Sequence, residues 1–237
     1  MKRFWKAVSV APDESDGHGL RLDGRPVRTP GRLPLIVPNL ALAEAIADEW
    51  RNVTDEIDPR AMPLTGLANA AVERVTRDPA PFIADIAGYG ETDLLCYRAE
   101  APDSLVARQA AVWDPLLDWA RERYDIAFVV TTGIMHRAQP AATVTRLREA
   151  VTARDPFRLA ALAPLTTIGG SLIAALALDE GAADVDTVWA ATHVDELWQA
   201  EMWGDDAQAA SARAARRRDF EAAAGFLRLL DEGRAGG

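Results

Sequence analysis

The spacing of hydrophobic residues changes near residue 39. Before this point, short apolar runs separated by turns predict strands over residues 4–10, 19–22, 25–28 and 33–37. The Asp23-Gly24 pair between two of these runs is typical of a two-residue hairpin turn. Because so few short strands are marginal alone, we expect this β-rich part to need a further element to pack against.

From Asn39 onward, apolar residues recur at helical spacing. Asn39 is a predicted N-cap for a helix in which Leu42, Ile46 and Trp50 share one face. A proline directly after an aspartate is typical of a helix start and recurs at residues 115 and 156. Further helices are predicted over residues 63–77, 103–113, 115–124, from 156, 188–203 and 205–230. A β-branched run, Ile126–Thr131, predicts one late strand.

These patterns predict an α+β protein, with a small β-rich N-terminal domain followed by a larger all-α C-terminal domain. We place the β-rich domain, with its one helix, at residues 1–60 and the helical domain at residues 61–237. If the predicted strand 126–131 rejoins the N-terminal sheet, the boundary between the domains becomes discontinuous.

Charge narrows the classes of partner. The 237 residues include 26 Lys and Arg against 36 Asp and Glu, a net charge of −10 that disfavours nucleic-acid binding. The densest basic group, Arg213 with Arg216–Arg218, lies beside acidic residues and is typical of a solvated, ion-paired helix face.

The longest apolar run, Leu172–Leu178, is far shorter than the roughly 20 residues of a membrane span. With no apolar signal stretch at the start, we expect a cytoplasmic protein.

Few residues suit catalysis or metal binding. The one cysteine, Cys96, lies in an apolar run that favours a buried, inert thiol. The three histidines, His18, His136 and His193, are not spaced as a helical metal-binding pair. We therefore expect neither a metal nor a cofactor.

The predicted helix 188–203 carries the most informative side chains. At about 100° per residue, Trp189, His193, Glu196 and Trp203 share one face. Two interpretations stay open: a core helix with Glu196 paired internally, or an exposed face that recognises a partner. An acid/base site around Glu196 and His193 is an alternative, although the sequence supplies no nucleophile to accompany them.

Several segments, taken in order, resemble the chaperones that assemble the F1 sector of ATP synthase, in particular those that act on its α subunit. The matching segments are residues 22–30 (LDGRPVRTP), 47–50 (ADEW), 62–65 (MPLT), 68–69 (AN), 92–98 (TDLLCYR) and 113–119 (WDPLLDW), then Glu196, Gln199 and Trp203-Gly204. Within these segments, we expect Trp50 and Trp113 to be structural.

This resemblance implies a non-enzymatic chaperone with a β-containing N-terminal domain and a helical C-terminal domain. Such chaperones bind the free α subunit through the surface that it later presents to the β subunit, without nucleotide or metal. The resemblance points to the bacterial cytoplasm, and to the mitochondrial matrix for relatives in organelles. We expect a monomer. A small-molecule enzyme and a permanent subunit of a complex are the alternatives.

On this interpretation, the partner-binding residues are Trp189, His193, Glu196, Gln199 and Trp203. The Glu196 carboxylate would pair with a cation of the client, while the indoles of Trp189 and Trp203 cover its apolar interface.

Overall fold

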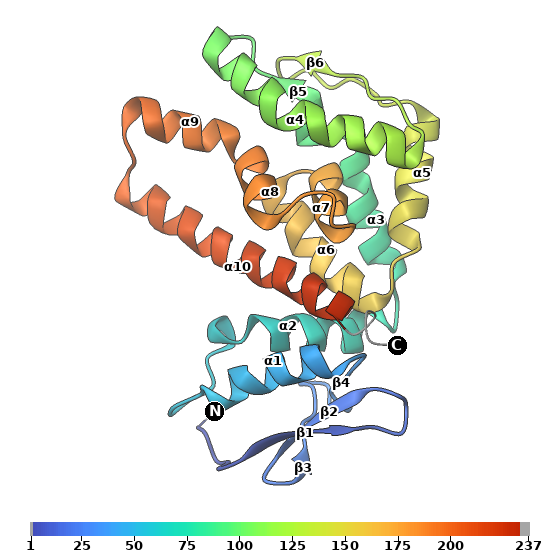
Figure 1. Ribbon diagram of the computed structural model, residues 1–237, viewed down its shortest axis with the longest axis vertical. Coiled ribbons are helices and arrows are strands. Elements are labelled where there is room, and N and C mark those ends of the chain that lie inside the picture. Colours follow the sequence, from blue (N-terminus) through green and yellow to red (C-terminus); the bar gives the residue numbers. More distant parts are fainter. Residues whose placement is uncertain (1, 233–237) are drawn as a thin grey trace. The chain divides into compact units, whose positions relative to one another are not determined.

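The computed structural model describes residues 2–232 and has the α+β architecture predicted from the sequence (Figure 1). The chain divides into two compact units. The first comprises the described parts of residues 1–79, 155–161 and 222–237, and the second comprises residues 80–154 and 162–221. The first unit therefore extends beyond the predicted boundary at residue 60 and includes two later stretches of chain.

A small antiparallel sheet forms the base of the first unit. Its central strand is β2 (His18–Leu22), which pairs with β1 (Val8–Pro12), β3 (Arg25–Pro26) and β4 (Ile36–Val37). Asp23 and Gly24 form the β2–β3 turn with positive φ angles of 48° and 81°, so the predicted hairpin is confirmed. Strand β1 lies later in the sequence than the predicted strand 4–10, and β4 is shorter than the predicted strand 33–37.

Helix α1 (Leu40–Arg51) packs on this sheet (Figure 1). The side chain of Asn39 accepts a hydrogen bond from the Leu42 amide at 2.9 Å, which confirms the predicted N-cap. The same side chain donates to the carbonyl oxygens of Leu229 and Leu230, at the end of the chain's last helix. The apolar face of α1 is buried, and Trp50 packs against the ring of Trp5.

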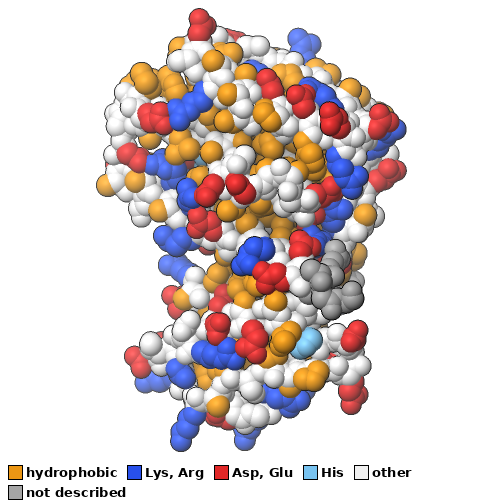
Figure 2. Space-filling model, viewed as in Figure 1, with side chains coloured by type: hydrophobic (Ala, Val, Ile, Leu, Met, Phe, Trp, Pro, Cys, Tyr) orange, Lys and Arg blue, Asp and Glu red, His pale blue; other side chains and the backbone are white. Residues whose placement is uncertain are grey.

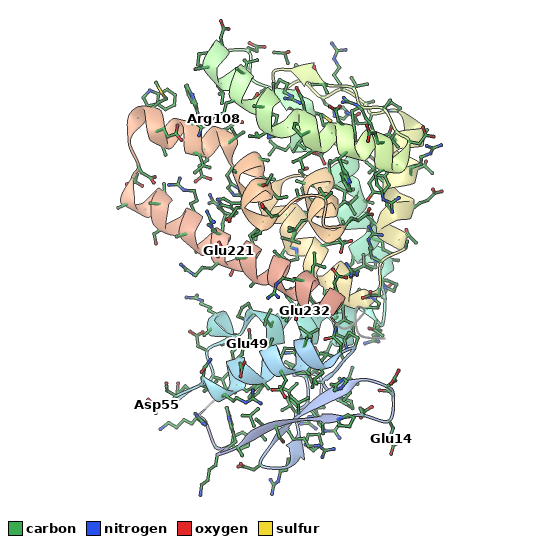
Figure 3. All side chains as sticks on the ribbon, in the orientation of Figure 1. Glu14, Glu49, Asp55, Arg108, Glu221 and Glu232 are labelled. Atoms are coloured by element: carbon green, nitrogen blue, oxygen red, sulfur yellow. The ribbon has the colours of Figure 1, made fainter. Side chains whose placement is uncertain are left out.

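Glu49 on α1 joins two of the segments that carry the family resemblance (Figure 3). Its carboxylate accepts hydrogen bonds from the amides of Leu64 and Thr65, at 2.7 and 2.8 Å, and from the Thr65 hydroxyl. It therefore satisfies the start of α2 (Pro63–Ala70), where the N-cap residue makes no side-chain bond. Burial raises the pKa of Glu49 despite these donors. The first unit also contains two short helices, η1 (Pro59–Ala61) and the π-helix η2 (Ala71–Val75).

The second unit is mainly helical. Its elements are α3 (Ala80–Gly88), η3 (Tyr89–Glu91), η4 (Leu94–Cys96), β5 (Tyr97–Arg98), α4 (Asp103–Tyr124), β6 (Thr131–Thr132), α5 (Ala141–Thr152), α7 (Leu172–Asp179), α8 (Val185–Thr192) and α9 (Val194–Trp203). Two further helices, α6 (Pro156–Gly169) and α10 (Ala207–Glu232), contribute residues to both units.

Two local predictions for this unit are wrong. The expected strand 126–131 is reduced to β6, which pairs in parallel with β5 of the same unit and does not rejoin the N-terminal sheet. The Asp114-Pro115 pair does not start a new helix, because α4 runs through it without interruption. Trp113, on α4, is fully buried, in agreement with the structural role expected for it.

Within the matching segment 92–98, Asp93 has a structural role. Its fully buried carboxylate accepts hydrogen bonds from the amides of Leu95 and Ile173, and so connects η4 to the start of α7. Burial raises the pKa of Asp93 to about 6. Burial also raises the pKa of Cys96 to about 12, so this thiol is protonated and unreactive, as predicted.

Candidate partner-binding surface

The segment expected to form one helix over residues 188–203 is two helices. The chain leaves helical geometry at His193, with φ −117° and ψ 16°, and this residue separates α8 from α9. The single face predicted from helical spacing therefore does not exist. Trp189 and His193, at the end of α8, are buried, Glu196 near the start of α9 is partly buried, and Trp203 at the end of α9 is exposed.

Trp189 and His193 form the buried group. Their side chains are only 3% and 6% exposed, and the two rings stack with their centres 3.5 Å apart. Phe220, from α10, packs edge-on against Trp189. The Nδ1 atom of His193 lies 3.0 Å from the Thr192 hydroxyl and 3.2 Å from the Trp189 carbonyl oxygen. Burial lowers the pKa of His193, which favours a neutral ring at physiological pH.

Glu196 is held within the protein. Its carboxylate accepts hydrogen bonds from Arg216 at 2.6 Å and Arg213 at 3.3 Å, both on α10. Arg213 also pairs with Asp205, in the turn between the two helices. The structure thus shows the internal pairing that was one of the two interpretations of Glu196. The acid/base alternative is not favoured, because Glu196 and His193 already have intramolecular partners.

The exposed group lies where α9 ends and α10 begins, and we call residues 199–206 the α9–α10 tip. Met202 and Trp203 are 58% and 73% exposed, and Gln199 is also exposed. Trp203 contacts Trp198 edge-on, with ring centres 5.3 Å apart. Gly204 has a φ of 88°, a backbone conformation that suits glycine at a helix end, and the chain reverses direction here (Figure 1). The tip therefore presents an apolar surface on a well-defined turn.

Helix α4 fixes the position of α9 through polar contacts. Arg108 makes a two-point ion pair with Glu201, at 2.5 and 2.7 Å, and lowers the pKa of that carboxyl (Figure 3). The buried side chain of Gln109 donates to Asp195 at 2.7 Å. The indole N–H of Trp113 donates to the carbonyl oxygen of Ala191, near the end of the preceding helix α8, also at 2.7 Å. The tip thus belongs to a helix that is anchored at several points.

Most basic residues of α10 form ion pairs with neighbouring acids. Besides the Arg213 and Arg216 pairs, Arg217 pairs with Asp186 and Glu221. On the face that Figure 2 shows, basic and acidic side chains are intermixed. The predicted ion-paired helix face is confirmed for Arg213, Arg216 and Arg217.

Sequence reasoning missed Met202, Arg108 and Gln109 as parts of this surface. The sequence does contain a signal for Met202. Met202 and Trp203 form an apolar pair directly before Gly204, a residue that commonly ends a helix. Arg108 and Gln109 gave no signal, since each meets α9 from a position more than eighty residues away in the sequence.

The structure also bears on metal binding and on membrane spans within residues 2–232. Among residues 2–232, no group of three or more His, Cys, Asp or Glu side chains is arranged to hold a metal ion. No helix in that range is long and apolar enough to cross a membrane. Cavities of about 460 and 410 Å³ are lined by residues other than Glu196 and His193.

The fold is shared with proteins of one class, the chaperones. A family model described as ATP12 chaperone protein matches residues 2–121. The chain therefore belongs to the ATP12 chaperone family, and its role as an assembly chaperone for F1-ATPase follows from that membership. The resemblance inferred from the sequence is confirmed.

Solved structures from two bacteria are similar over nearly the whole chain. Atp12 from Paracoccus denitrificans is 43% identical, with a TM-score of 0.91 over 96% of this chain and 97% of that one. The Atu1473 protein from Agrobacterium tumefaciens is 41% identical, with a TM-score of 0.92 over 97% of this chain and 86% of that one. The mitochondrial protein atp12 of Schizosaccharomyces pombe is 24% identical over 217 residues, which cover 86% of this chain and 74% of the yeast protein.

Proposed function

We propose that this chaperone binds the unassembled α subunit of F1-ATPase and covers the surface that α later presents to the β subunit. Membership of the ATP12 family supports an F1 client. The exposed apolar α9–α10 tip is the observation that carries the proposal, because large side chains left in water on an anchored turn are typical of a binding surface.

In this proposal the five predicted residues have different roles. Trp203 and Gln199 contact the client directly, with Met202 beside them. Glu196 acts as a positioning residue, because its bonds to Arg213 and Arg216 join α9 to α10. Trp189 and His193 support the same helices from the core and do not touch the client.

The proposed contact is mainly apolar. Glu201 is paired with Arg108, and Asp205 is paired with Arg213, so these charges at the tip already have partners. An indole entering an apolar pocket of the client would then account for most of the affinity, while the surrounding paired charges exclude water. Such a contact lasts only until the β subunit competes for the same surface of α.

We further propose that the protein acts as a monomer in the bacterial cytoplasm and catalyses no reaction. The cytoplasmic location is supported by similarity to proteins of two bacteria. The absence of catalysis is supported by the intramolecular contacts that Glu196 and His193 already make, and by the protonated thiol of Cys96.

Co-purification from the source cell tests this function. The tagged full-length protein is expected to capture free α subunit at a one-to-one ratio, without the remainder of F1, and added β subunit should release it. Capture of the β subunit alone would contradict the choice of client. Stable recovery within assembled F1 would show a permanent subunit instead of a chaperone.

A further inference from the structure

The first unit contains a groove whose lining residues differ from those of the α9–α10 tip. It has a volume of about 410 Å³, within the range of sites that accept small molecules or side chains. Its apolar lining comes from three elements far apart in the sequence, and includes Ile36 and Val37 of β4, Val72 of η2 and Phe157 of α6. Apolar side chains that meet in an open hollow are the usual floor of a recognition site.

The loop before β2 gives this groove an acidic rim. The loop carries Asp13, Glu14 and Asp16, all exposed, and Asp16 lines the groove itself. The carboxylate of Asp13 accepts hydrogen bonds from the amide and hydroxyl of Ser15, at 3.0 and 2.6 Å, and these bonds lower its pKa. Asp13 is therefore ionised at neutral pH, and the rim is negative.

The backbone holds this rim directly against the apolar floor. A Cβ atom on Gly17 would lie 2.4 Å from a methyl carbon of Ile36 and 2.9 Å from the Val37 carbonyl oxygen. Glycine is therefore needed for the loop to pack so closely on β4. Asp16, just before it, has a φ of 64°, a left-handed conformation that aspartate and asparagine tolerate better than most residues.

We propose that this groove docks a protein segment in which an apolar side chain is flanked by lysine or arginine. The apolar side chain enters between Val72 and Phe157, and the flanking cations face the carboxylates of the 13–16 loop. Charge complementarity selects this occupant, because Asp16 is the only charged side chain among the described residues that line the groove, and its two charged loop neighbours are acidic too. The same charges disfavour an anionic lipid surface.

Peptide titration of the full-length protein tests this proposal. The probe is an acetylated, amidated Gly-Lys-Leu-Lys-Gly peptide, and the control replaces both lysines with glutamate. Amide shifts in a nuclear magnetic resonance titration are expected at Ile36, Val37 and Val72 for the lysine peptide, with far weaker binding of the glutamate peptide. Raising the salt concentration should weaken the lysine peptide selectively.

Three variants locate the interaction. Glu14→Gln with Asp16→Asn removes two rim charges and keeps a residue that tolerates the left-handed backbone, so we expect about three- to tenfold weaker binding of the lysine peptide. Asp55→Asn with Glu56→Gln removes the same charge elsewhere in the unit and should leave binding unchanged; Figure 3 shows Glu14 and Asp55 far apart in this unit. Thr76→Trp, which fills the groove, should abolish binding while the melting curve shows a folded protein.

Three results would overturn the proposal: equal binding of the two peptides, shifts that map elsewhere, or no shifts at about 2 mM peptide. A dimer in sedimentation that Thr76→Trp dissociates would instead identify a second copy of the chain as the occupant. The inference is separate from the proposed function, because a Trp203→Ala variant is expected to bind the lysine peptide like the parent protein.

Discussion

The helices on either side of His193 place similar aromatic side chains in opposite environments. Trp189 on α8 is 3% exposed and lies between His193 and Phe220, whereas Trp203 at the end of α9 is 73% exposed. Both indoles belong to a short stretch rich in apolar residues. The comparison shows that two indoles from one apolar-rich stretch have different roles. Trp189 on α8 is part of the core, whereas Trp203 at the end of α9 is part of the surface.

The largest expected effect is at the buried indole. Trp189→Ala should lower the free energy of unfolding by about 3–5 kcal/mol, because it leaves a cavity beside His193 and Phe220. Urea unfolding followed by circular dichroism measures this loss. Trp189→Phe, which keeps an aromatic ring, should lose much less. A Trp189→Ala protein as stable as the parent would show that this half of the segment is not part of the core.

A smaller effect is expected where α9 meets α10. Glu196→Lys brings a third cation to Arg213 and Arg216 and should cost about 1–2 kcal/mol of stability. Glu196→Gln removes the charge without adding repulsion, so its loss should be smaller. Thermal melting at low and high salt measures both, and the difference between the variants should shrink as salt increases.

Charge exchange separates positioning from direct contact at this pair. Combining Glu196→Lys with Arg216→Glu restores opposite charges between the helices and should recover most of the lost stability and binding of the α subunit. Stability recovered without binding would mean that the Glu196 carboxylate itself meets a cation of the client, as the sequence first suggested.

The smallest effect concerns protonation of His193. Its pKa is lowered by burial, so the unfolded chain takes up a proton at higher pH than the folded one. Acidification from about pH 7 to pH 5 should therefore destabilise the parent protein relative to His193→Phe, which keeps the stacking on Trp189 but does not titrate. Unfolding of both proteins across this range measures the difference, and parallel curves would show that His193 is not buried as a neutral ring.

Elements set by local chemistry could be predicted from the sequence. The Asp23-Gly24 turn and the Asn39 cap each depend on one or two adjacent residues, and each forms as predicted. The late strand 126–131 was predicted from β-branched residues alone, and only its end pairs with β5. Neither does local sequence show that α6 and α10 contribute to both units, because that depends on long-range packing.

The candidate site could be predicted only in part for the same reason, because its geometry depends on contacts between residues far apart in the sequence. Helical spacing placed Trp189 and Trp203 on one face only if the helix continued through His193. The structure ends α8 there, where the Ala191 carbonyl accepts the indole N–H of Trp113 from 78 residues away. Asp195, in the first turn of α9, accepts a bond from Gln109 on the same distant helix. Neither contact can be predicted from the spacing of apolar residues within 188–203.

The most direct test of the account is the affinity of the α subunit for a Trp203→Ala variant. A matched control is Phe4→Ala, which removes an aromatic side chain that is 64% exposed in the first unit. Loss of a central indole anchor should weaken binding about 30-fold, with little change in unfolding, whereas the control should bind as the parent does. Parental affinity in Trp203→Ala, or an equal loss in Phe4→Ala, would contradict the assignment of the client surface to the α9–α10 tip.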